Sequence, residues 1–244
     1  MDWRAETEKH IRNVQSLLAG FAEHVVMDCS PEAAQAAPPI HEVRSLPEMV
    51  AVVSDMLHVV ECAKSVLGGA HELDEQVGTI LVNTVDAYEA YIAGVETGRP
   101  VLPFRTWLLD GIVARAPGHD ASKLEEPEAP IFAEYTAKLK GCTYGSDEYK
   151  QFLHEMKPAL DHHYHHPANR HHPEHFEGGV DDMNLIDVVE LACDWFAAGL
   201  RHADGNFAKS VEHNTERFKL SPMTAQLLRG TEAFFEMMRP QLEE

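Results

Sequence analysis

Hydrophobic positions recur at a helical period along most of the chain. In the first segment an apolar stripe is formed by Trp3, Val14, Leu17, Phe21 and Val25, and His10 lies on it. Positions three, four and seven residues apart share one face of an α-helix, so the pattern predicts an amphipathic helix over residues 3–26.

The same period predicts helices along the rest of the chain. Segments with this period, separated by turn residues, cover residues 48–67, 72–95, 104–115, 129–140, 146–163, 185–202 and 204–218. Ser221 and Pro222 predict the start of a last helix, because serine caps helix N-termini and proline suits the first turn. The proline-containing segment 27–46 predicts a loop. No segment alternates polar and apolar residues in the manner of a strand, so we expect an all-α fold.

Charge narrows the choice of partners. The 244 residues include 40 Asp and Glu but only 20 Lys and Arg, which gives a formal net charge of −20. This balance argues against a nucleic-acid polymer and against an anionic membrane surface as partners. The chain has no apolar run long enough for a membrane span and no signal-peptide core at its start. Its four cysteines are scattered, so a cytoplasmic protein is expected.

Histidine is the unusual residue of this composition. Seven of the 16 histidines fall between residues 162 and 175, in the sequence DHHYHHPANRHHPEHF. Seven are too many for one ion, since a structural zinc takes four ligands, so some of them must face substrate or solvent. A His-rich surface loop is the alternative. The interleaved Pro, Asn, Arg and Glu residues favour a site in which at least two of the histidines bind metal or substrate.

A second candidate is the carboxylate of Asp194. It lies within VVELACDWFAAGL, where an ionised group is costly unless it is paired or bound to metal. A metal or catalytic role is favoured, and the alternatives are an ion pair with Arg201 or a carboxylate turned to the surface. Asp187, one heptad earlier, is interpreted as a solvated carboxylate at the start of the helix.

The third candidate is the pair His119-Asp120 in PGHDASK. An imidazole and a carboxylate at a helix boundary can both reach one first-row transition metal ion. Lys123 follows one turn later, where it could contact a phosphate or simply be solvated. His10 could be a ligand, or a core histidine with one satisfied nitrogen.

In chain order these candidates read H…HD…HH…D, an order that resembles the HD superfamily of metal-dependent phosphohydrolases, which is all-helical. The resemblance implies that four residues hold the principal metal: His10, His119, Asp120 and Asp194. It also implies that His162 and His163 hold a second ion. The expected cofactor is one or two divalent ions of Mn, Fe, Co, Ni or Zn, with no organic cofactor.

The chain also resembles an uncharacterised family of phages and bacteria. The motifs are HDxSK, HHxxxxxNRHHPEH and CDW between about His119 and Ala225, together with EKHIRNVQSLL near the N-terminus. Members of that family connect the first helix to the HD motif by a short segment. We therefore expect an HD-like metal-binding domain formed by residues 1–26 and 105–244. Residues 27–104 are then an inserted helical hairpin, which could serve as a lid, a partner surface or a contact between copies of the chain.

The resemblance favours metal-dependent hydrolysis of a small phosphoester, with a nucleotide as the expected substrate. His171 or His172 could act as general acid, because imidazole titrates near neutral pH. The residues expected to bind substrate are Lys123, Asn169, Arg170 and Arg201. Two alternatives stay open: a di-iron oxygenase of the HD type, and a metal-stabilised protein that only binds a partner.

Overall fold

The structure is a computed structural model that describes residues 2–28, 40–56, 74–142, 146–201 and 205–242. Every regular element in these ranges is helical, and no strand occurs in them. The expected all-α fold is therefore confirmed.

The longer helices are α1 (Trp3–Asp28), α3 (Leu46–Met56), α5 (Glu75–Gly94), α6 (Phe104–Arg115), α7 (Glu128–Gly141), α8 (Asp147–Glu155), α9 (Lys157–His165), α10 (Leu185–Gly199), α11 (Phe207–Phe218), α12 (Pro222–Gly230) and α13 (Glu232–Met238). Five 3-10 helices connect or flank them in the described ranges: η1 (Ile40–Glu42), η2 (Ala121–Leu124), η3 (Pro173–His175), η4 (Gly179–Asp182) and η5 (Arg239–Gln241).

Most helix ends lie close to the predicted ones, but two predicted helices are divided. The segment 146–163 forms α8 and α9, which meet at Met156. Pro158 explains the break, because proline has no N–H to donate and is tolerated only in the first turn of a helix. The last predicted helix starts as expected, with the Ser221 side chain capping Thr224 N, but it divides at Thr231 into α12 and α13. Of the predicted helix 48–67, the part beyond residue 56 lies outside the described residues.

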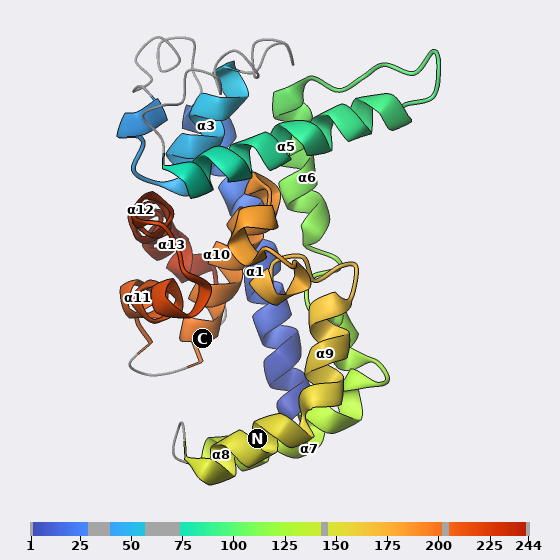
Figure 1. Cartoon of the computed structure of the whole chain (residues 1–244), viewed down its shortest axis with the longest axis vertical. Helices are drawn as coiled ribbons and strands as arrows, with labels where there is room; N and C mark the ends of the chain where they lie inside the picture. The colour runs from blue at the N-terminus through green and yellow to red at the C-terminus, as the bar shows by residue number, and fades with distance from the viewer. Residues whose placement is uncertain (1, 29–39, 57–73, 143–145, 202–204, 243–244) are drawn as a thin grey trace.

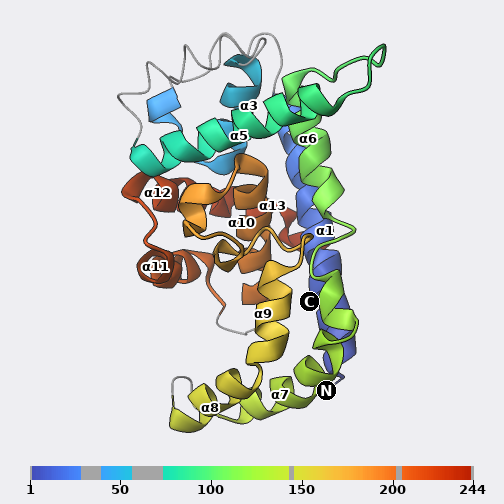
Figure 2. The ribbon, with the colours of Figure 1, turned by 45° about the vertical axis from the view of Figure 1, so that its right-hand side comes forward.

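The long helix α1 runs along the long axis of the molecule, and the other helices are arranged around it (Figure 1). It packs against α10, α6 and α3, while α5 crosses one end of the bundle and contacts α10, α12 and η4. Helices α7, α8 and α9 lie at the opposite end, beside the start of α1, as the rotated view also shows (Figure 2).

One hydrophobic core joins most of these elements. It includes buried residues of α1, α10 and α6, and also Val43, Met49 and Val50 of the 40–56 segment and Ile80 and Leu81 of α5. The described helices of the expected insertion 27–104 therefore share the core of the rest of the chain, because their apolar faces are buried against it.

A second, smaller core lies where α7 and α9 meet the start of α1. It contains Phe132, Met156 and Ala159, with Trp3 packed against it. Along α1, His10 stands between Trp3 of the small core and Val14 of the main core. This junction between the two cores is where the polar candidates meet.

Candidate metal centre

Four predicted ligands meet at this junction and form the first ligand group: His10, His119, Asp120 and Asp194. One donor atom from each lies within 4.8 Å of the others. His10 Nε2 is 2.9 Å from Asp194 Oδ1 and 3.7 Å from Asp120 Oδ2. His119 Nε2 is 3.7 Å from the same Asp194 oxygen. This group could hold a metal ion, with two imidazoles and two carboxylates as donors.

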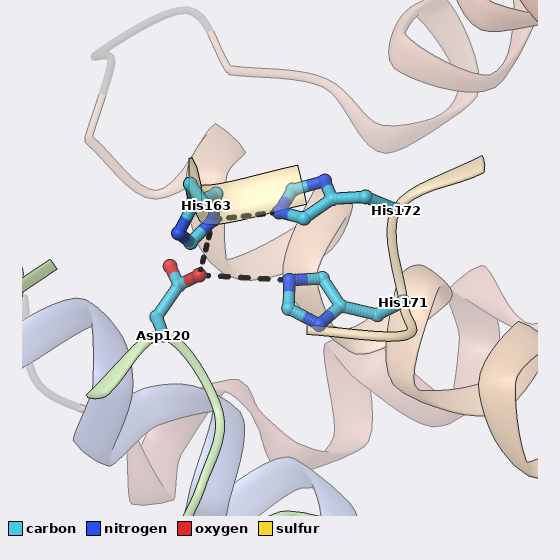
Figure 3. Close-up of side chains that lie close together, drawn as sticks. All are labelled: Asp120, His163, His171 and His172. Atoms are coloured by element: carbon cyan, nitrogen blue, oxygen red, sulfur yellow. Dashed lines mark hydrogen bonds and ion pairs between the residues drawn. The ribbon is translucent and has the colours of Figure 1, made fainter. Parts of the chain in front are cut away.

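A second ligand group lies beside the first and consists of Asp120, His163, His171 and His172. His163 Nε2 is 3.1 Å from Asp120 Oδ1 and 2.9 Å from His172 Nε2, and His171 Nε2 is 3.6 Å from Asp120 Oδ1 (Figure 3). Asp120 is common to both groups, and its two carboxylate oxygens face different groups. Oδ2 faces His10, whereas Oδ1 faces His163 and His171 of the second group.

The backbone of Asp120 is held in an unusual conformation. Its φ of 54° and ψ of 7° place it in the left-handed region, which is uncommon for a residue with a side chain. Such conformations persist where the surrounding structure imposes them, often at functional sites. Here the conformation sends the chain from α6 into η2 while the Asp120 side chain stays fully buried between the two ligand groups.

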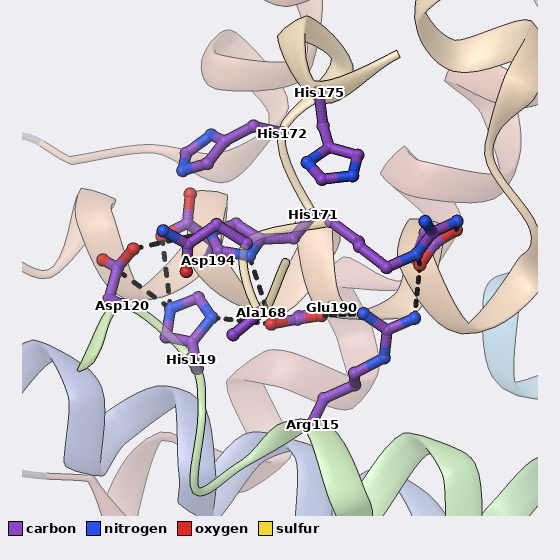
Figure 4. Close-up of polar contacts among 12 residues, drawn as sticks. Arg115, His119, Asp120, Ala168, His171, His172, His175, Glu190 and Asp194 are labelled. Atoms are coloured by element: carbon purple, nitrogen blue, oxygen red, sulfur yellow. Dashed lines mark hydrogen bonds and ion pairs between the residues drawn. The ribbon is translucent and has the colours of Figure 1, made fainter. Parts of the chain in front are cut away.

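Two further carboxylates lie behind the histidines. Glu190 Oε1 is 2.9 Å from His119 Nδ1 and 3.1 Å from His171 Nδ1 (Figure 4). Glu128 Oε2 is 2.9 Å from His163 Nδ1. A carboxylate on Nδ1 fixes the ring orientation and leaves Nε2 available as a ligand, as in many metal centres. Both glutamates are fully buried.

Glu190 and Glu128 are two residues of this centre that the sequence pattern did not predict. A signal for Glu190 was present, because it is four residues before Asp194 and so shares its face on the most hydrophobic helix. No comparable local signal marks Glu128, which begins a helix far from the histidines in sequence.

The electrostatics of the centre follow from burial and close pairing. Burial lowers the pKa of His10 to about 4, even though the hydrogen bond with Asp194 opposes the shift. Burial and the neighbouring His171 also hold the pKa of His172 well below its usual value. Both rings are therefore neutral near pH 7, which is the form that binds metal.

His171 and Glu190 behave in the opposite sense. Burial alone would lower the pKa of His171, but the nearby carboxylates of Asp120 and Glu190 outweigh burial and raise it to about 10. Burial would raise the pKa of Glu190, but contacts with His119 and His171 lower it to about 2. Without a metal, the pair is thus an imidazolium and a carboxylate.

Several buried polar atoms of the centre fit a metal ion. Among the described residues, three atoms that face the ligand groups have no hydrogen-bond partner: His119 Nε2, His171 Nε2 and Asp120 Oδ1. Buried polar atoms are rarely left unpaired, because the loss of hydration is costly. Imidazole nitrogens and carboxylate oxygens are ligands of first-row transition metals, so these orphaned atoms suit such an ion.

The remaining predicted site residues lie outside the ligand groups. The His162 side chain is 41% exposed, and its Nδ1 is 2.7 Å from Glu128 Oε1, so it faces away from the centre. Lys123 Nζ is 2.5 Å from Asp120 Oδ2. Asn169 is buried and donates to Ser122 Oγ and to the His163 carbonyl. Arg201 is exposed, but its charge contributes to the low pKa of His10.

The interpretation of Asp187 as a solvated carboxylate is wrong. Asp187 is fully buried, and Arg115 Nη2 lies 2.5 Å from its Oδ1. The predicted substrate ligand Arg170 also binds Asp187, with Nη2 3.2 Å from Oδ2. Asp187 also forms a capping box with Asn184 at the start of α10. It therefore neutralises two arginines and caps a helix.

No described helix is long and apolar enough to cross a membrane. No curated protein and no solved structure matches the chain.

One family model, described as "Family of unknown function (DUF5662)", matches residues 57–237. The match contains every residue of the two ligand groups except His10. It also contains α5, which belongs to the segment expected as an insertion. Since the match covers more than half of the 244 residues, the chain belongs to this family of unknown function.

Proposed function

We propose that the protein is a metal-dependent phosphohydrolase of the HD type that acts on a small phosphoester, with a nucleotide as the preferred class. The observation that carries the proposal is that Asp120 lies between the two ligand groups and belongs to both of them. Sites in which two ions share a carboxylate suit displacement at phosphorus, where both the attacking and the leaving oxygen need stabilisation.

The proposal gives each ligand group one ion. His10, His119, Asp120 and Asp194 would hold one ion, and Asp120, His163, His171 and His172 would hold the other. A bound divalent ion lowers the pKa of a coordinated water towards neutrality and polarises a phosphoryl oxygen. The nucleophilic water and the phosphoryl group would thus be activated at the junction of the two cores.

Positive side chains at the centre support an anionic substrate in an acidic protein. Lys123 is 19% exposed beside Asp120, and Arg201 lies within electrostatic range of His10. Both would offset the repulsion that a net charge of −20 exerts on a phosphate group. This local balance favours a substrate of low charge, such as a phosphate monoester, over a polyphosphate.

A metal assay with paired variants tests this function. The wild-type protein is expected to bind two Mn²⁺ per chain and to release phosphate from nucleoside monophosphates. Asp120→Ala should lose both ions, because both groups share that carboxylate, whereas Asp194→Ala should lose one. Elemental analysis after desalting measures the metal content of both variants. Wild-type metal content in the Asp120→Ala variant would overturn the proposal.

The three histidines of the second group also favour iron, so a di-iron oxygenase is the second candidate. Oxygen uptake by iron-loaded protein, without phosphate release from any ester of the panel, would favour it over hydrolysis.

A further inference from the structure

We infer that Glu190 couples the two ligand groups, so that ion binding in either group depends on this one carboxylate, whereas Glu128 supports only the second group. The inference deepens the proposed function and rests on the metal centre described above.

The geometry of Glu190 is the first argument. A single oxygen, Oε1, is 2.9 Å from Nδ1 of His119 and 3.1 Å from Nδ1 of His171. His119 belongs to the first ligand group and His171 to the second. The rings of these two histidines pack against each other, with centroids 4.3 Å apart. Glu190 therefore touches both groups from behind, on the side opposite Asp120 (Figure 4).

The chemistry of a carboxylate is the second argument. An ionised carboxylate only accepts hydrogen bonds, so each histidine must carry its proton on Nδ1 to pair with Glu190. The Nε2 atoms of both rings are then free to bind an ion. Without Glu190, the buried His119 N–H would lose its hydrogen-bond acceptor, and His171 Nδ1 would lose its ion-pair partner at 3.1 Å. Both rings could then adopt the other tautomer.

The third argument is the support for Glu190 itself. Its side chain is fully buried on α10, one turn before Asp194. Arg115 Nη1 is 3.6 Å from Glu190 Oε2, while Arg115 Nη2 binds Asp187. The positive charge of the arginine offsets the buried negative charge of Glu190 at ion-pair distance.

Glu128 provides a matched comparison within the same centre. It is equally buried and also lies behind a ligand, but its neighbours are His163 and the exposed His162. Of these two, only His163 belongs to a ligand group, the second one. Glutamine in place of either glutamate therefore removes one buried negative charge. Of the two glutamates, only Glu190 contacts both ligand groups.

The test is a calorimetric titration of chelator-treated protein with Mn²⁺, with bound metal counted by elemental analysis. Glu190→Gln should weaken both binding events by about 10- to 100-fold, the usual effect of removing an outer partner of a ligand. Glu128→Gln should weaken one event by a similar factor and leave the other at its wild-type affinity. Circular dichroism of the metal-free variants verifies that both retain the wild-type helix content.

Two results would overturn the coupling while the proposed function stands. In both, the wild type binds two Mn²⁺ ions, and Glu190→Gln weakens either only one of the two binding events or neither of them. A wild-type protein that binds no Mn²⁺ would instead refute the metal centre, and the coupling with it.

If Glu190→Gln does not fold, a measurement on the wild-type protein tests the inference instead. In zinc-loaded wild-type protein, two-bond ¹H–¹⁵N correlation spectra should show His119 and His171 both protonated at Nδ1. A proton on Nε2 of either ring would contradict the inference.

Discussion

At the scale of single residues, position in space separates the clustered histidines into classes that their sequence spacing does not. His163, His171 and His172 converge on Asp120, whereas His162, adjacent to His163 in the chain, is 41% exposed and faces Glu128. Consecutive residues on a helix point about 100° apart, so two neighbours rarely face the same ion. The His-rich sequence thus contains three members of a ligand group together with residues that face away from it.

This division predicts different effects of two histidine substitutions. His172→Ala should remove one of the two Mn²⁺ ions, because it deletes a donor of the second ligand group. His162→Ala should leave the metal content unchanged, because its side chain contacts only the rear of that group through Glu128. Elemental analysis of both variants measures the difference, and equal metal loss would contradict the geometry.

The titration of His171 predicts how the metal-free protein responds to pH. Its pKa is raised from 6.5 to about 10, so the folded protein keeps a proton that the unfolded chain loses between these values. The resulting stabilisation is complete below pH 6.5 and is lost as the pH rises towards 10. Urea unfolding of chelator-treated protein should give a lower free energy of unfolding at about pH 8.5 than at pH 6.5.

Glu190→Gln is the control for this pH effect. It removes one of the acceptors that raise the pKa of His171, so the difference between the two pH values should shrink. A wild-type protein that is equally stable at both values would show that His171 carries no extra proton in the folded state.

At the scale of elements, α10 is a helix of the main core that also supplies side chains to the metal centre. Most of its residues are buried in the main core, while Asp187, Glu190 and Asp194 line one face at steps of three and four. Each of these carboxylates has a basic partner: Asp187 binds two arginines, Glu190 binds His119, and Asp194 binds His10. The helix can bury Asp187 and Glu190 fully and Asp194 in large part because every one of these carboxylates is paired.

Two glycines in other helices predict opposite effects of the same substitution. Gly78 lies within α5, and a Cβ built there meets no atom within 4 Å, so Gly78→Ala should stabilise the protein by about 0.5–1 kcal/mol. At Gly230, the end of α12, a Cβ would lie against the backbone carbonyl of Arg44. Gly230→Ala should therefore destabilise the protein by about 1–3 kcal/mol. Thermal unfolding measures both changes, and two changes of the same sign would contradict this packing.

At the scale of the whole molecule, the described helices α3 and α5 of the segment 27–104 are packed into the main core. Met49 and Val50 of α3 and Ile80 and Leu81 of α5 are buried in one cluster with residues of α1 and α10. The Arg105 guanidinium also lies 3.4 Å from the Val25 carbonyl, so the two ends of the segment lie side by side. The ends are therefore near enough to be joined, and α3 and α5 between them cover part of the core.

Deletion of residues 27–104, with a short Gly/Ser linker between α1 and α6, tests this interpretation. The shortened chain should lose cooperative thermal unfolding, because it would expose the apolar faces that α3 and α5 now bury. The full-length protein is the control. A shortened chain that unfolds cooperatively near the wild-type temperature would show that the segment is a separate unit.

The sequence by itself determined the helical class and most helix ends. Its resemblance to the HD superfamily also pointed to five of the seven residues that form the two ligand groups: His10, His119, Asp120, His163 and Asp194. Helical period, caps and breaking residues are local properties, so they can be interpreted without knowing what a helix packs against. The ligand order H…HD…HH…D is likewise a linear pattern.

Only the tertiary structure decided which side chains meet. It separated His162 from His163, brought His171 and His172 onto Asp120, and placed Glu190 and Glu128 behind the histidines. It also buried Asp187 and turned Arg170 onto it. These outcomes depend on how distant helices cross and on the left-handed conformation at Asp120. Contacts between residues far apart in sequence leave no periodic signal in the chain, so only the packed fold shows them.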